Sequence, residues 1–408
     1  MPLPDTPRRP RRLVVGAGYV AAAISFMNVT TYAFTALVAR SVAPSVFGEV
    51  TALMGILLVG SVAALGLQAT TARRLATCPP AQRLALVREA GRATVVIGST
   101  ATALVLLLSP LLLRVLALDQ WAALAVVAAT LLPLAVFGAQ AGVAQGTGRW
   151  LHLALLYLGV GAGRVLFGAL GALASPTSTG AMVGVLIGSL VPVAIGWRLL
   201  LLPWRRPAHG PAASRSMLVE TLLGSQALLA FFAVTNADAV LARVVLSPDD
   251  SGRYAAGLIV AKAALFLPQF VAIVVFPTLA RADRPRVRRA AFLSVAAVGA
   301  VAALGTWLLP DLAVAFAGGD RYAQVRDLLP LFAVEGGVFA LVNLLVYDSL
   351  AERSARMVVA LWSVLIGVVL SAVLFVDTLT GLVLTMVAAG LCSCAAHVVL
   401  RKTPDPRQ

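Results

Sequence analysis

Residues 121–146 read WAALAVVAATLLPLAVFGAQAGVAQG and contain no charged side chain. A helix needs about 20 mostly apolar residues to cross the hydrocarbon core of a bilayer. This run exceeds that length, and Asp119 and Arg149 stand just outside its two ends. It therefore predicts a transmembrane helix with polar segments on both sides of the membrane.

The same pattern recurs along the whole chain. Of its 408 residues, 60% are hydrophobic and only 12% are charged, whereas about a quarter of the residues of an ordinary globular protein are charged. The polar segments between the apolar runs are too short to fold as separate soluble domains. We therefore expect an all-α, polytopic membrane protein of about twelve transmembrane helices. The expected helices are 14–39, 50–71, 93–116, 121–146, 150–172, 179–202, 217–245, 254–280, 290–316, 327–351, 357–376 and 378–400.

Lysine and arginine are distributed unequally between the two sides of this layout. One side collects 24 of them and the other only six, and two more lie within helices. Because short cytoplasmic loops carry an excess of Lys and Arg, we expect both termini in the cytoplasm and the protein in the cell (inner or plasma) membrane. The net charge of +15 then reflects topology, and a nucleic-acid partner is not expected.

The chain is also doubled at an offset of 204 residues. Pro44 and Gly48 in the first half correspond to Pro248 and Gly252 in the second. Six helices per half leave both halves in the same orientation, so we predict two parallel six-helix lobes with a substrate path between them. The expected division is a basic cytoplasmic tail (1–13), an N-terminal lobe (14–202), a cytoplasmic linker (203–216), a C-terminal lobe (217–400) and a second cytoplasmic tail (401–408).

Four ionisable residues fall inside predicted helices, where a charge is costly unless it is paired or hydrated. Arg164, Lys262, Asp238 and Glu335 lie at similar depth, which predicts a shared polar interior. Arg164 and Lys262 carry donors suited to a diphosphate or an acidic sugar. Asp238 and Glu335 would hold these bases in the empty state or exchange a proton during the transport cycle. Static ion pairs that orient the helices are the other interpretation.

Further charged residues lie near the predicted helix ends. Arg149, on the cytoplasmic side, is a candidate for drawing an anionic headgroup toward the site; a charge that only sets the topology is the other interpretation. Arg40 and Arg243 end the first and seventh helices at nearly equivalent positions of the two halves, so we predict a shared role in an outer gate. Favourable charge at a helix C-terminus and headgroup contact explain both arginines equally well. Glu49 and Glu220 lie near helix starts, where the helix dipole favours an acid, and we interpret them as caps.

Several short motifs give the chain a resemblance to a known family. They are Ala39-Arg40 followed by Pro44-Ser45-Val46-Phe47-Gly48, Leu65-Gly66, Arg73-Arg74-Leu75-Ala76, Gln145-Gly146-Thr147-Gly148-Arg149, Asp238, Gly252-Arg253-Tyr254-Ala255-Ala256 and Phe276-Pro277-Thr278-Leu279-Ala280-Arg281. Their order and spacing resemble the polysaccharide exporter branch, with its O-antigen-type flippases, of the multidrug/oligosaccharidyl-lipid/polysaccharide exporter superfamily. Residues 72–92 lack the Gly-x-x-x-Asp-Arg motif usual in the major facilitator fold.

The resemblance implies alternating access between the lobes and a lipid-linked saccharide of the polyprenyl diphosphate type as the flipped substrate. Membrane lipids and a coupling proton or sodium ion are the other expected partners. An ion-coupled exporter of small amphipathic drugs in the same superfamily is the alternative, and a membrane subunit without transport is a third interpretation. The sequence shows no nucleophile constellation, phosphate loop or metal motif, so no enzymatic activity, cofactor or metal is expected.

Overall fold

The computed structural model describes residues 9–118, 120–204, 214–279, 284–351 and 355–402. Within these residues it contains twelve helices of 18 residues or more and no strand, which confirms the predicted fold class. Eleven of the twelve qualify as membrane spans by length and composition. The twelfth, α10 (Pro248–Leu279), carries Asp249, Asp250, Arg253 and Lys262 in the half whose side chains are described.

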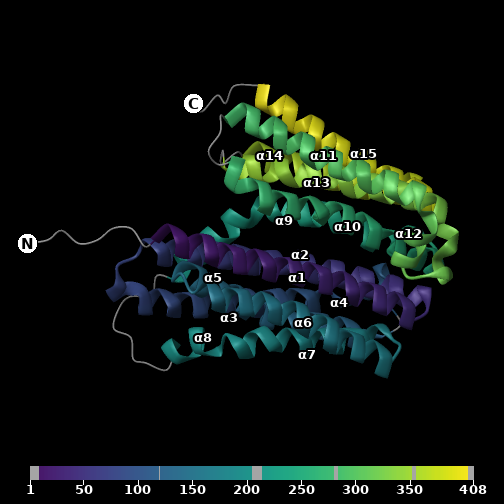
Figure 1. The fold of residues 1–408 in the computed structure, drawn as a ribbon. Helices are drawn as coiled ribbons and strands as arrows, with labels where there is room; N and C mark the ends of the chain where they lie inside the picture. The colour runs from purple at the N-terminus through teal and green to yellow at the C-terminus, as the bar shows by residue number, and fades with distance from the viewer. Residues whose placement is uncertain (1–8, 119, 205–213, 280–283, 352–354, 403–408) are drawn as a thin grey trace, which may run out of the picture.

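The helices form two lobes, which Figure 1 shows as two layers, purple to teal for the first and green to yellow for the second. The first lobe holds α1 (Arg9–Ser41), α2 (Pro44–Thr77), η1 (Pro80–Gln82), α3 (Arg83–Leu107), α4 (Ser109–Val115), α5 (Trp121–Gly146), α6 (Trp150–Ala174), α7 (Ser178–Ile195) and α8 (Trp197–Trp204). The second holds α9 (Ser214–Val245), α10, α11 (Arg284–Leu308), α12 (Pro310–Phe316), η2 (Asp320–Leu328), α13 (Leu329–Ala351), α14 (Ala355–Phe375) and α15 (Leu379–Lys402).

The lobes meet mainly along α2 and α9, which run antiparallel, and α10 also packs against α2. α1 and α10 touch over a shorter stretch. Figure 1 places the start of α1 and the end of α15 at the same end of the bundle. We name this end the terminal face, and the end that carries α4, α12 and η2 the distal face.

Three predicted spans, 93–116, 179–202 and 290–316, each divide into a long and a short helix. Pro110 and Pro310 lie in the first turns of α4 and α12, where a proline is tolerated because those amides lack a helical acceptor. α7 ends before Gly196. Each break turns the chain at a face of the bundle instead of prolonging the span.

The starts of α2 and α9 also differ from the sequence-based bounds. α2 begins at Pro44 and α9 at Ser214, so neither helix has an acidic residue in its first turn. The interpretation of Glu49 and Glu220 as helix caps is therefore wrong. Both side chains contact the other lobe instead, as described below.

Large apolar side chains cover the outside of the bundle. Leu107 is 77% exposed, Val301 68% and Phe375 82%, although such residues are normally buried in a protein surrounded by water. Lipid tails solvate these side chains well, whereas backbone polar groups must be paired inside each helix. The exposed surface is therefore that of a multi-pass membrane protein.

Candidate functional site: a basic cavity between the lobes

A cavity of about 340 Å³ lies between the lobes. Helices α1, α2, α5 and α6 line it from the first lobe, and α9 and α10 line it from the second. Its wall is mainly apolar, with aromatic rings from both lobes. These rings belong to Tyr32, Phe34, Phe47, Phe137, Tyr157, Phe231, Phe232 and Phe266. The volume falls in the range of sites that bind small molecules.

Arg164 and Lys262 both line this cavity, Arg164 from α6 of the first lobe and Lys262 from α10 of the second. In the described part of the wall they are the charged residues, and no Asp or Glu accompanies them. Arg164 Nη1 donates a 3.4 Å hydrogen bond to Thr31 Oγ1, and Lys262 Nζ donates to the backbone carbonyl of Thr235. The wall therefore presents positive charge from both lobes to one space.

Adjacent residues of α1 contact both cationic positions. Thr31 accepts the hydrogen bond from Arg164, and the Tyr32 hydroxyl donates to the backbone carbonyl of Lys262. Helix α6 approaches α1 closely because of Gly161, where a Cβ would lie 2.4 Å from a side-chain oxygen of α1. The two cations therefore belong to one polar patch, which α1 connects across the lobe interface.

Asp238 and Glu335 lie behind the cavity wall, inside the second lobe. Asp238 on α9 is fully buried, Glu335 on α13 is 2% exposed, and neither lines the cavity. Their carboxyl groups are within hydrogen-bonding distance of each other, and Lys262 and Tyr254 of α10 interact electrostatically with both. In the described part of the chain, no donor reaches Asp238 Oδ2 or Glu335 Oε2. Lys262 therefore connects a buried acid pair to the cavity.

The other predicted site residues lie at the two faces of the bundle. Arg149 is exposed in the turn between α5 and α6, on the terminal face, and does not line the cavity. On the distal face, Arg40 of α1 donates to the carbonyl of Ala315 in α12 (2.7 Å). Arg243 of α9 donates to two backbone carbonyls just after α4 (2.9 and 2.8 Å). Both arginines cross between the lobes; their gating role stays a prediction.

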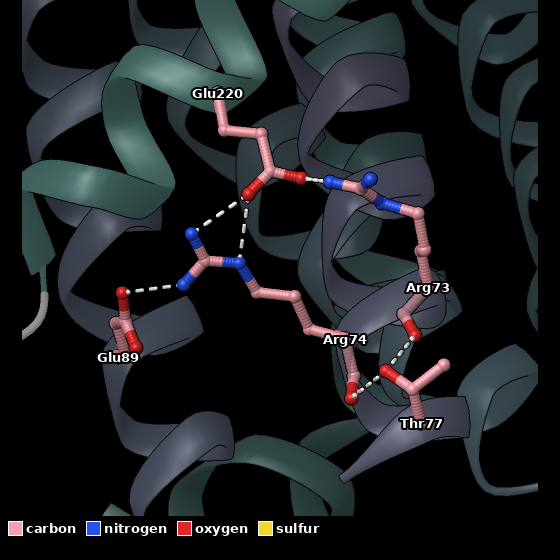
Figure 2. A network of polar contacts seen from close by, with 5 residues as sticks. All are labelled: Arg73, Arg74, Thr77, Glu89 and Glu220. Atoms are coloured by element: carbon pink, nitrogen blue, oxygen red, sulfur yellow. Dashed lines mark hydrogen bonds and ion pairs between the residues drawn. The ribbon is translucent and has the colours of Figure 1, made fainter.

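Sequence reasoning missed a second charged contact between the lobes, on the terminal face (Figure 2). Glu220 Oε2 of α9 accepts hydrogen bonds from Arg74 Nε and Nη2 of α2 (2.9 and 2.7 Å), and its other oxygen pairs with Arg73. Arg74 Nη1 also donates to Glu89 Oε1 of α3 (3.1 Å). We name these four residues the terminal clasp. Their pairing follows from the antiparallel packing of α2 and α9, which no local pattern reveals.

No protein-family model matches this sequence, and no similar curated protein is found. Solved structures nevertheless share its architecture. A multidrug resistance MATE family transporter of the MOP superfamily, in an inward-facing conformation, has a TM-score of 0.67 over 95% of this chain and 100% of that chain, with 12% identity. Lipid II flippase MurJ, in an inward closed conformation, has 0.64 over 94% and 87%, with 11% identity. The eukaryotic MATE transporter AtDTX14 has 0.62 over 97% and 96%, with 14% identity.

At these identities the similarity is one of fold. The chain has the all-α, two-lobed fold of the MATE transporters and MurJ. The resemblance seen in the sequence therefore holds at the level of the fold. Its polysaccharide exporter branch stays a prediction.

Proposed function

We propose that this protein is an alternating-access transporter of the cell membrane, with both termini in the cytoplasm, that flips a lipid-linked oligosaccharide or polysaccharide precursor. The observation that carries the proposal is the cavity in which Arg164 and Lys262 are the charged residues of the described wall. Guanidinium and ammonium groups form strong, charge-assisted hydrogen bonds to phosphate oxygens. A wall with these two cations and no described carboxylate favours an anionic headgroup such as a diphosphate.

The rest of the wall suits the neutral part of such a substrate. Tyr157 and Phe137 pack edge to face at 5.6 Å between ring centroids, and Asn28 and Asn236 supply amide groups. At about 340 Å³ the cavity is too small to hold a polyprenyl chain together with its headgroup, so the chain would stay among the membrane lipids. MurJ, which shares the fold, is a lipid II flippase, and flipping of a lipid-linked substrate enters our proposal by that similarity.

The acid pair supports ion coupling. Two carboxyl groups within hydrogen-bonding distance need a shared proton or a neighbouring cation, because an ionised carboxylate only accepts hydrogen bonds. Lys262 interacts with both Asp238 and Glu335 and also lines the cavity. An anion that binds at Lys262 would weaken the interaction of Lys262 with the two acids. By linkage, an ion bound at the acids would change the affinity of the cavity for the anion. We propose that a proton or sodium ion drives transport through this connection.

A second candidate function is ion-coupled export of small amphipathic compounds. The mainly apolar, aromatic wall and the MATE transporters among the structural relatives support it. Arg164 and Lys262 would repel cationic compounds, so this candidate applies to neutral or anionic ones. The two cations of the cavity therefore argue against export of cationic drugs, and they are compatible with both candidate functions.

Both candidates can be tested with purified protein in liposomes, using a labelled polyprenyl-diphosphate sugar and a fluorescent anionic dye. We expect movement of the labelled lipid, and at least a tenfold loss in Arg164→Ala and Lys262→Ala. Arg326→Ala, which removes a partly exposed ion pair with Asp311 (2.9 Å) outside the cavity, is the matched control. Transport of the dye alone would support the second candidate. Movement of neither molecule would contradict both.

A further inference from the structure

The terminal clasp joins the two lobes through one carboxylate. Arg73 and Arg74 belong to α2 and Glu89 to α3, all in the first lobe, whereas Glu220 belongs to α9 of the second. In Figure 2 both guanidinium groups reach Glu220, and Glu89 holds the opposite side of Arg74. The lobes can therefore separate at this face only if Glu220 leaves both arginines.

The clasp closes a seam that is already dry. Thr71 of α2 and Met217 and Thr221 of α9 are fully buried next to it in sequence. Thr71 and Thr221 lie deeper in the bundle than the clasp residues of their helices, and Met217 lies about one turn nearer the terminal face. The clasp side chains are themselves partly exposed: 63% for Arg73, 27% for Glu220 and 22% for Arg74. An aqueous path along this seam would have to break the clasp.

The clasp can open without leaving a buried charge that lacks both an ion-pair partner and water. When Glu220 leaves, Arg74 keeps its ion pair with Glu89 inside the first lobe. Arg73 is already mostly in water, and Glu220 becomes hydrated. By contrast, a buried ion pair that loses one partner leaves an uncompensated charge and is strongly destabilised. The terminal clasp is thus a contact with a second stable arrangement, as a moving part requires.

We propose that Glu220, with Arg73 and Arg74, is the latch of a gate on the terminal face, which closes when Glu220 binds the arginines and opens when Arg74 retains only Glu89. The proposal rests on alternating access and not on the identity of the substrate. It assigns Glu220 a role that neither its sequence context nor the cavity suggests.

The latch can be tested by the access of a water-soluble thiol reagent to the cavity. The reporter is Ser61→Cys, which lines the cavity and whose hydroxyl bonds only within its own helix, to Leu58 O (2.7 Å). It is introduced after Cys78, Cys392 and Cys394 are replaced by serine. A separate protein with Ala81→Cys, exposed in η1 on the terminal face, establishes the side from which the reagent acts.

We expect Glu220→Ala to raise the labelling rate of the reporter from the terminal side at least tenfold. The matched control is Asp250→Ala, which removes an ion pair of 2.7 Å with Arg253 inside α10 that does not join the lobes. Labelling of the Glu220→Ala protein at the unmodified rate would overturn the proposal. Because no substrate is used, this result does not depend on which substrate is transported, and failure of the latch can be told apart from failure of the proposed substrate.

A second measurement covers the case in which Glu220→Ala impairs folding. Arg73→Cys and Glu220→Cys are joined by a short thiosulfonate cross-linker, which a reductant reverses. We expect the linked protein to exclude the reagent from the cavity on the terminal side, and the reduced protein to admit it. In this case the reporter is Ser61→Lys, read with a water-soluble amine-reactive reagent in a protein whose two natural lysines, Lys262 and Lys402, are replaced by arginine. Equal access before and after reduction would overturn the latch.

Discussion

The α2–α9 seam is held by charges at both ends, and the two ends are built differently. At the terminal clasp, Glu220 of α9 meets two arginines of α2, and three of the four side chains are at least 22% exposed. At the distal end the charges are exchanged between the two helices, because α9 carries the base, Arg243, and α2 carries the acid, Glu49 (3.6 Å). Arg243 is only 3% exposed there. We name Arg243, Glu49 and the two carbonyls that follow α4 the distal clasp.

The difference lies in what each clasp leaves behind when it opens. Arg243 has two backbone carbonyls of the first lobe as acceptors, and these would lose their donor when the lobes part. The distal face has further cross-lobe bonds, from Arg321 to the carbonyl of Val42 (2.6 Å) and from Tyr322 to that of Ala39 (3.1 Å). The distal face is therefore the more firmly closed one in this conformation, and the terminal face is the one that we expect to open first.

We expect the largest change in access from a substitution that forces the distal face open. A Cβ on Gly252 would lie 1.9 Å from the carbonyl oxygen of Pro44, so Gly252→Leu must push α10 away from the start of α2. Overpacking of this kind costs about 3 kcal/mol, or about a hundredfold in an equilibrium. We expect the Ser61→Cys reporter to become labelled about a hundredfold faster from the distal side.

Gly224→Leu is the matched control for this wedge, because a Cβ there meets nothing within 4 Å. It should leave the labelling rate unchanged. If Gly252→Leu remained closed from the distal side while folded and stable in detergent, the packing of Gly252 on Pro44 would not be part of the distal closure.

The distal clasp itself gives the next largest effect. Arg243→Ala removes the donor of one buried and one partly buried carbonyl, which costs about 2 kcal/mol, or about thirtyfold in distal access. Arg243→Lys keeps the charge and loses the planar fork of donors, so it should restore only part of the closure. The measurement is again reporter labelling, with Arg253→Ala as the control in a partly exposed pair inside one helix. Full restoration by lysine would show that charge alone closes this face.

The fold followed from the sequence because it depends on patterns that are local. Apolar runs of sufficient length, such as 121–146, fix where helices cross the membrane. The offset of 204 residues also placed Gly48 opposite Gly252, and in the structure these two glycines meet at the interface, where a Cβ on Gly48 would lie 3.1 Å from the amide nitrogen of Gly252. Equivalent residues lie near each other only close to a pseudo-two-fold axis, so this contact agrees with the predicted repeat, which stays a prediction.

The site followed from the sequence only in part. Intramembrane charge was enough to select Arg164 and Lys262, which line one cavity, and Asp238 and Glu335, which form a pair behind it. The partners of Glu49 and Glu220 could not be found in this way, because each lies on the other lobe. The helix dipole is a local effect and suggested caps, whereas the cross-lobe pairs depend on the side-by-side packing of α2 and α9.

A substitution at Glu89 should have a smaller effect on the terminal clasp, and it should slow labelling of the reporter instead of accelerating it. Glu89→Gln removes the charge that retains Arg74 in the first lobe, so Arg74 should bind Glu220 more tightly. A partly exposed pair is worth about 1 kcal/mol or less, so we expect terminal labelling of the reporter to slow by about fivefold. Glu220→Ala should accelerate it. If Glu89→Gln also accelerated labelling, Glu89 would belong to the closed state alone, and the latch would have no second arrangement.

The smallest effect is expected at Arg40, which the repeat places near the equivalent of Arg243. Arg40 is exposed and donates a single bond, to the carbonyl of Ala315, and water can replace it at a cost of about 1 kcal/mol or less. Arg40→Ala should therefore raise distal labelling by only a few-fold, well below Arg243→Ala measured in the same membranes. Equal effects of the two substitutions would mean that position in the repeat, and not burial, sets how much each arginine contributes to closing the distal face.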